Sequence, residues 1–414
     1  MSSVYQPTAT NQSLATLHVY KDTHRCRTNY PSSTKISRST LADILKDTHY
    51  MYPMECEQRP NILSRVLLCI FELEGDKDQA VNAYQQLVSS LHLLRPVSIS
   101  VDIHQGNWKQ HFGDTSCYQS YLTFFDTEIE QHGLSFVLTQ YLNAMPPSIH
   151  SQLQPLVHIA FGLEHDLPLM VSEGLAHLAS TLDDASTWIL PTHNSNTATN
   201  LSSTTTPHCS FDYLLFDCIQ SDPRFNGVME GGRPVAAKIK LLLKNHGPLL
   251  QNYLQQWLAP SRSAEQQMDE LINVTLRMME TKLLDEPTHQ LLASILALRT
   301  LSTMWSPEVL SQWIQVQALL MICTFIVQGR PSNTKMNTLG AANITAVELA
   351  AQPVLFLQQQ DDWSRCIASF ISAGPPPCLI LTMRSLYKTQ QRILGPSSCL
   401  RLANTLVASL KEDL

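Results

Sequence analysis

The sequence is poor in glycine and in charged residues. Only 14 of its 414 residues are glycine and 15% are charged, whereas 44% are apolar. Because glycine supplies many of the tight turns that join strands, so few glycines argue against a fold rich in β-hairpins. The high apolar content excludes disorder over most of the chain and allows a large core. We therefore expect a protein built mainly from helices.

Several motifs that would indicate a particular chemistry are also missing. The formal net charge is −7 and no basic run is present, so nucleic acid is not an expected partner. The ten cysteines include no Cys-x-x-Cys pair, which argues against a zinc site and favours reduced thiols. No glycine-rich phosphate motif of a flavin, nicotinamide or nucleotide site occurs, which excludes a Rossmann-type enzyme.

Membrane and export signals are absent as well. The longest apolar run, Ala318 to Val327, is shorter than the ~20 residues that cross a bilayer. The N-terminal stretch lacks the apolar segment of a secretory signal, although its Ser/Thr content leaves a targeting segment open. We expect a cytoplasmic protein without a membrane partner. The sequence does not indicate an oligomeric state.

The chain divides into a polar start and a long helical region. Residues 1–40 are polar and without period, which predicts a flexible segment, whereas residues 41–414 are expected to form one all-helical domain. A polar stretch at residues 192–207 predicts a long loop within that domain.

Apolar residues recur at spacings of three and four through most of the domain, which is the period of an amphipathic helix. Gly75 and Gly133 interrupt this pattern. The predicted helical segments are 60–91, 118–142, 155–179, 211–219, 236–258, 266–284, 289–301, 307–327, 346–360, 361–372 and 378–392. No segment shows the alternation of a strand. The pattern predicts an all-α, multi-helix array.

His158 and His165 raise the first question of function. They are seven residues apart, which on a helix places them about 10 Å apart along the axis, so one metal ion cannot easily bind both. A single histidine on an apolar helix is more often a core residue than a ligand, and both interpretations stay open. Glu164 projects away from His158, as a carboxylate at a helix end would. Gly162 suits close helix packing or room for a ligand.

Five segments together resemble the questin oxidase-like family, whose members open anthraquinone rings by a Baeyer-Villiger-type reaction. The resemblance covers roughly residues 55–392. It is carried by GNWKQHFGD (106–114), PLVHIAFGLEHDLPLMVSEGLAHLA (155–179), SDPRF (221–225), SILALRTLS (294–302) and QGRP (328–331).

The sequence departs from the family pattern where the family carries histidines. The family's HNHxxHH block is matched by PNILSRV at residues 60–66, and the first histidine of its HPLIH block by Gln154. A further histidine corresponds to Gln290, next to His289, and the family's late D-x-H-x-x-K motif has Cys378 and Leu381 in place of His and Lys. Because one imidazole holds a metal only weakly, we do not expect a metal to be retained.

The resemblance implies an all-helical oxidoreductase with an internal apolar cavity, which acts on a planar polycyclic aromatic substrate with dioxygen and NADPH. In this interpretation His158 and Glu164 are catalytic, and the substrate-binding residues are Asn107, Trp108, Phe161 and Gly162. The alternative is a catalytically inactive relative that serves as a scaffold for binding a small molecule or a protein. The blocks around Trp108 and His158, which resemble those of the family, favour the enzyme, whereas the missing histidines favour the scaffold.

Overall fold

The structure is a computed structural model that describes residues 35–56, 59–94, 101–190, 208–227, 234–258, 261–331, 352–392 and 398–412. These residues form fifteen α-helices, several short 3-10 turns and a single two-stranded hairpin. The prediction of an all-α array is therefore confirmed. The predicted loop at 192–207 and nearly all of the predicted flexible segment at 1–40 lie outside the described residues.

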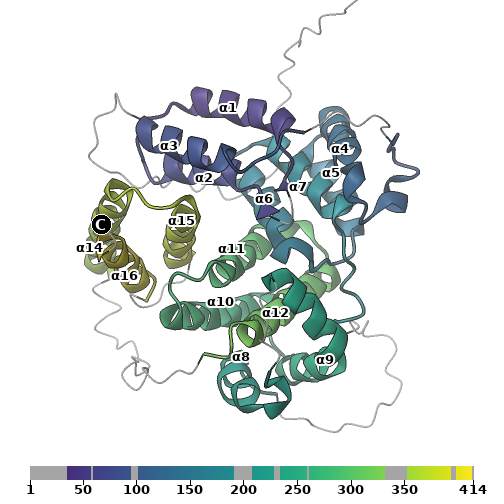
Figure 1. The fold of residues 1–414 in the computed structure, drawn as a ribbon, viewed down its shortest axis with the longest axis vertical. Coiled ribbons are helices and arrows are strands. Elements are labelled where there is room, and N and C mark those ends of the chain that lie inside the picture. Colours follow the sequence, from purple (N-terminus) through teal and green to yellow (C-terminus); the bar gives the residue numbers. More distant parts are fainter. Residues whose placement is uncertain are drawn as a thin grey trace, which may run out of the picture.

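Three helices form the N-terminal part, at the top of Figure 1. They are α1 (Arg38–Met51), α2 (Leu63–Glu72) and α3 (Lys77–Val88). Side-chain caps start two of them: Ser37 accepts from the backbone N–H of Thr40, and Asp76 forms a reciprocal capping box with Gln79. A hairpin of two very short strands, β1 (Glu55–Cys56) and β2 (Arg59–Pro60), joins α1 to α2.

Four helices follow and include the most closely packed pair. They are α4 (Tyr118–His132), α5 (Leu134–Tyr141), α6 (Gln154–Glu164) and α7 (Pro168–Ser180). Gly133 has a φ of 82° and separates α4 from α5, as predicted. A Cβ atom on Gly162 would lie 2.7 Å from Val171, and one on Gly174 would lie 2.5 Å from Ile159. These glycines therefore allow α6 and α7 to approach closely.

A second group of helices lies below α6 and α7 in Figure 1. It contains α8 (Phe211–Tyr213), a π-helical turn (Leu214–Ile219), α9 (Val235–Trp257), α10 (Ala264–Thr281), α11 (Glu286–Leu301) and α12 (Pro307–Val327). By length and composition α12 could cross a membrane, but 83% of its apolar window is buried inside the protein. The helix has the predicted bounds, 307–327, and it packs as a core helix against α9, α10 and α11.

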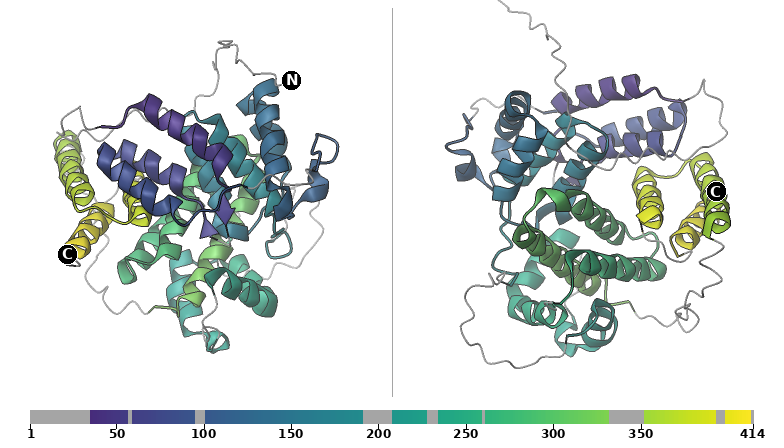
Figure 2. Two further views of the ribbon diagram at one scale, coloured as in Figure 1. Left: turned by 45° about the horizontal axis from the view of Figure 1, so that its top comes forward. Right: turned by 180° about the vertical axis from the view of Figure 1, so that it is seen from behind.

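Three C-terminal helices complete the described fold: α14 (Gln352–Ser372), α15 (Pro377–Arg392) and α16 (Ser398–Glu412). They form a group at one side of the molecule, which Figure 2 shows from two further directions. Of the three, α15 contacts both α2 and α11. The four helices α2, α6, α11 and α15 therefore come together although they are far apart in the sequence.

The local structure differs from the predictions in four places. Residues 38–40 belong to α1, which the polar composition did not reveal, and the hairpin β1–β2 is too short to show alternation. The segments 346–360 and 361–372 were predicted as separate helices, but residues 352–372 form one helix. Helix α16 was not predicted.

Candidate functional site: a cavity between four helices and a buried polar chain

A cavity lies between α2, α6, α11 and α15. The empty space between its walls, including the part open to solvent, is ≈ 500 Å³. Only ≈ 40 Å³ of this space is wide enough to hold the centre of a water molecule. The inner part therefore holds only a few water molecules, and a flat ring system enters only if wall side chains move. The lining consists of Ile62, Arg65, Gln154, Val157, Phe161, Glu286, His289, Gln290, Ala293, Cys378, Leu381, Thr382 and Ser385.

Two polar groups of α11 on the cavity wall are held by hydrogen bonds. The Nε2 atom of His289 donates to the carbonyl oxygen of Leu283 at 2.5 Å, so Nδ1 accepts from the Thr382 hydroxyl at 2.8 Å. Burial lowers the pKa of His289, which keeps the ring neutral. Gln290 donates from Nε2 to the carbonyl oxygen of Gln152 at 3.0 Å. Both side chains therefore have fixed orientations.

Other polar groups on the wall lack partners. The Oε1 atom of Gln154 and the Nε atom of Arg65 are buried, and neither forms a hydrogen bond within the described structure. The chain reaches Gln154 through three consecutive residues with positive φ: Ser151, Gln152 and Leu153, at 50°, 50° and 60°. Such a conformation costs about 1–3 kcal/mol for each residue that is not glycine, so the surrounding contacts must hold this turn in place.

Phe161 lines the cavity, as the prediction of a substrate-binding role requires. The guanidinium carbon of Arg384 lies 4.0 Å from the centre of the Phe161 ring. Arg384 also forms ion pairs with Glu72 and with Glu164, the last residue of α6. Burial alone would raise the pKa of Glu164, but the cations of α15, above all Arg384, lower it to about 2. Glu164 is thus an ionised helix-end carboxylate that anchors α15.

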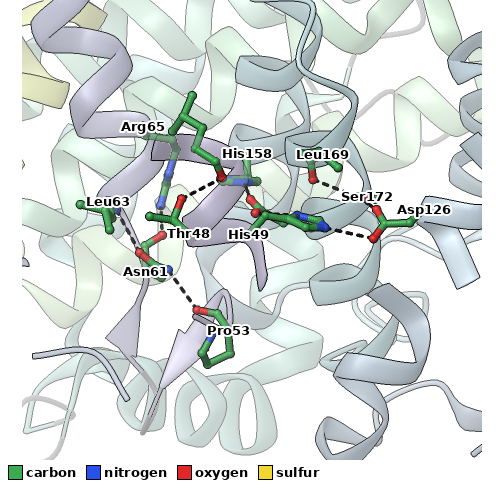
Figure 3. Close-up of polar contacts among 12 residues, drawn as sticks. Thr48, His49, Pro53, Asn61, Leu63, Arg65, Asp126, His158, Leu169 and Ser172 are labelled. Carbon is green, nitrogen blue, oxygen red and sulfur yellow. Dashed lines mark hydrogen bonds and ion pairs between the residues drawn. The ribbon is translucent and has the colours of Figure 1, made fainter. Parts of the chain in front are cut away.

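His158 does not line the cavity, although Val157 and Phe161 on the same helix do. Its ring points toward α7, where Nε2 lies 2.5 Å from Oε2 of Glu173. The other oxygen of Glu173 lies 2.9 Å from Nδ1 of His49, and Nε2 of His49 lies 3.0 Å from Asp126. Figure 3 shows this chain of contacts, which begins at the partly exposed Asp126 and ends at His158. His158 thus does not face the cavity that the resemblance implies, because its imidazole is turned toward Glu173.

The charges along this polar chain follow from burial and hydrogen bonding. Burial would lower the pKa of His49, but its bonds to Asp126 and Glu173 outweigh burial and raise that pKa to about 9. Burial would raise the pKa of Glu173, but its bonds to His158 and His49 lower it. For His158 burial prevails, and its pKa is lowered. At neutral pH His49 is therefore protonated, Glu173 is ionised and His158 is neutral, with an unpartnered Nδ1 atom.

A further buried histidine, His177, lies one turn after Glu173 on α7. The Nε2 atom of His177 lies 3.1 Å from Oε2 of Glu55, which also accepts from the hydroxyl of Ser151 and lies 3.5 Å from Nε2 of His150. Burial would raise the pKa of Glu55, but these hydrogen bonds lower it. Glu55 thus ties the positive-φ turn before α6 to α7. This cluster was not predicted; its one signal in the sequence is the four-residue spacing of Glu173 and His177.

The other predicted site residues lie away from the cavity. Trp108 packs edge-on against Phe112 and Tyr141, with ring centres 5.2 and 4.9 Å apart. The side-chain amide of Asn107 donates to the backbone of Asp102 and accepts from His104, so it stabilises its own loop. Gly162 serves close helix packing, the first of the two roles considered. A substrate wall shared by Trp108 and Phe161 is thus a wrong prediction, because Trp108 belongs to an aromatic cluster around α4 and α5.

Thiols and metal ligands add little to this site. The nine cysteines in the described ranges are all free thiols. In the same ranges, no three His, Cys, Asp or Glu side chains are arranged so that they could hold a metal ion. His49, His158 and His177 bind carboxylates, whereas His289 binds a backbone carbonyl and a hydroxyl group.

Comparison of the sequence with known proteins places the chain in a family named after an oxidase. The profile of the questin oxidase-like family matches residues 60–375, and the chain belongs to that family. A Baeyer-Villiger oxidase, notM, from Aspergillus sp. is 38% identical over 69 residues, which are 15% of this chain and 17% of the relative. The questin oxidase of Aspergillus terreus is 27% identical over 149 residues, or 32% of each chain.

A third relative is the Baeyer-Villiger oxidase ptaJ of Pestalotiopsis fici, 33% identical over 86 residues, or 19% of each chain. This chain therefore matches about a third or less of the length of these three relatives. The names of the family and of these relatives denote oxidoreductases.

The cavity gathers the positions at which the sequence departs from the family's histidine pattern. Ile62 and Arg65 come from the segment that matches the histidine-rich block, and both line the cavity. Gln154, Gln290, Cys378 and Leu381 also line it. Segments more than 300 residues apart in the sequence thus meet in one place.

Proposed function

We propose that the chain is an oxidoreductase that binds a planar polycyclic aromatic ketone, of polyketide or anthraquinone type, in the cavity between α2, α6, α11 and α15. Its membership in the questin oxidase-like family supports an oxidative reaction of Baeyer-Villiger type. The observation that carries the proposal is the convergence of the family's histidine positions on one cavity.

The proposed reaction is balanced by dioxygen and NADPH. The ketone, dioxygen, NADPH and a proton yield an ester, water and NADP⁺, and one oxygen atom enters the carbon–carbon bond next to the carbonyl group. The cavity does not fit a dinucleotide, because it offers a single cation, Arg65, and little inner space. We therefore propose NADPH as the reductant of the overall reaction and assign none of these residues to it.

The side chains of the cavity would bind and orient the substrate. The ring of Phe161 offers an apolar wall, with the Arg384 guanidinium against it. Arg65 and Gln154 offer polar atoms without protein partners. We assign His158 a supporting role: its neutral ring can take up a proton at Nδ1, while the Glu173 carboxylate at Nε2 stabilises the resulting positive charge.

Substrate-dependent oxygen uptake tests the proposal. With a hydroxylated anthraquinone and NADPH, we expect consumption of both dioxygen and NADPH, and incorporation of one atom of ¹⁸O from ¹⁸O₂ into the product by mass spectrometry. The variant His158→Gln should lower turnover more than substrate affinity, because His158 does not touch the cavity. Absence of uptake with a panel of such quinones, despite measurable binding, would contradict the oxidative function.

The second candidate is a binding protein without turnover. It is favoured by Gln154, Gln290, Cys378 and Leu381, which stand where the family pattern has His or Lys. In that case the same aromatic compounds would bind in the same cavity, and neither dioxygen nor NADPH would be consumed.

A further inference from the structure

Arg65 is a buried cation without an anionic partner. Its side chain is 1% exposed and lines the cavity. Its closest described acceptor is the carbonyl oxygen of Asn61, 3.5 Å from a terminal nitrogen, and its Nε atom forms no hydrogen bond. Burial lowers the pKa of Arg65 to about 10, so the group is still charged at neutral pH. An unpaired buried charge costs several kcal/mol, which a ligand of opposite charge would offset.

Arg384, the other buried arginine in the described part of the chain, is paired with carboxylates. Arg384 is 4% exposed and forms ion pairs with both Glu72 and Glu164. No described carboxylate forms such a pair with Arg65. The one carboxylate in the cavity lining is Glu286, which is exposed at the start of α11 and therefore well screened by water. Arg65 is thus the charged group that the inner cavity offers to a ligand.

A second unpartnered atom lines the same cavity. The Oε1 atom of Gln154, at the start of α6, is buried and accepts no hydrogen bond. A carbonyl-type oxygen in this state needs a donor such as a hydroxyl group. The cavity thus presents one unsatisfied cation and one unsatisfied acceptor, between apolar walls that include Phe161 and Val157.

We propose that the cavity binds an aromatic anion, in which Arg65 contacts an ionised oxygen atom and Gln154 accepts from a hydroxyl group of the ring. The ionised oxygen can be that of a phenolate or of a carboxylate, since a guanidinium binds either. This inference names the substrate class of the proposed function and rests on it for the aromatic framework. It does not depend on the oxidation step.

Binding of matched probes to the full chain tests this inference. The probes are 1-hydroxy-2-naphthoate and its neutral carboxamide, which have nearly the same shape and differ by one charge. By isothermal titration calorimetry we expect the anion to bind at least about tenfold more tightly than the amide. A hydroxyanthraquinone titrated through the ionisation of its phenol distinguishes the phenolate from the carboxylate: tighter binding of the ionised form shows that phenolate is accepted.

Variants assign the preference to particular residues. Arg65→Met should reduce the preference for the anion to about onefold, and Arg65→Lys should keep part of it, because the charge remains without the planar fork. Gln154→Leu should weaken both naphthalene probes by a similar factor, because both keep the hydroxyl group. Arg401→Met, whose arginine pairs with Glu280 away from the cavity, serves as the control and should leave the preference unchanged.

Equal binding of the acid and the amide by the wild-type protein would overturn the inference, as would an undiminished preference in Arg65→Met. If Arg65→Met does not fold, Arg65→Lys is used in its place. A full preference for the anion in Arg65→Lys, together with unchanged affinity of both probes for Gln154→Leu, would then contradict the inference. Absence of binding by every probe also overturns it. Oxygen uptake is measured separately. Uptake without a preference for the anion contradicts only this inference, whereas a preference for the anion without uptake contradicts only the oxidative function.

Discussion

Replacing His49 by glutamine should remove one pH-dependent contribution to stability. The His49 ring is fully buried between Asp126 and Glu173, and its pKa rises from 6.5 to about 9. A group with a higher pKa in the folded state stabilises the fold fully below its unfolded pKa, and this stabilisation is lost as the pH rises through the folded pKa. The difference corresponds to about 3 kcal/mol, which disappears between about pH 6.5 and pH 9.

Chemical denaturation of the wild-type protein and His49→Gln, at about pH 6 and about pH 10, measures this contribution. The wild type should be more stable than the variant at the lower pH, and this advantage should shrink by about 3 kcal/mol at the higher pH. Buried tyrosines and other shared groups titrate in both proteins and cancel in the difference. The exposed His104→Gln is a control for loss of a histidine elsewhere. An advantage that is the same at both pH values would refute the reasoning.

Two further substitutions test the packing around the site. Gly162→Ala should lower the free energy of unfolding by about 1–3 kcal/mol. The reason is that the added methyl group would lie 2.7 Å from the Val171 side chain and 3.0 Å from the Val171 backbone nitrogen. A thermal stability equal to that of the wild type would contradict this close approach. Arg384→Met should cost about 1–3 kcal/mol, because the partly buried Glu72 and Glu164 would lose their shortest ion pairs and keep only more distant cations of α15. A urea midpoint like that of the wild type would show that these ion pairs are not needed.

The sequence predicts most of the helices, because their apolar residues repeat at helical spacing over two or more turns. Helix α1 escaped the prediction because its buried face is narrow and consists of Leu41, Leu45, Thr48 and His49. The period of the chain therefore reveals helices that bury a wide apolar face, whereas a helix with polar buried residues is recognised only once its partners are known.

The site was only partly predictable. His158 was found because it stands out in an apolar segment, but its partner His49 is remote in the sequence and reaches it through Glu173. Arg65 and Gln154 were recognised as departures from a family pattern, and their meeting in one cavity depends on the packing of α2 against its neighbours. Such long-range contacts depend on the packing angles of helices, which the spacing of apolar residues does not determine.

The central claim is that the cavity between α2, α6, α11 and α15 is the place of substrate binding and reaction. Ala293 lines this cavity, and Ala293→Phe would add a ring to its wall. The most direct test is quinone-dependent oxygen uptake by this variant beside the wild type, with unchanged circular dichroism as the check of folding. We predict that the wild type consumes oxygen and that the variant loses at least about tenfold in rate; equal rates in the two proteins would contradict the claim.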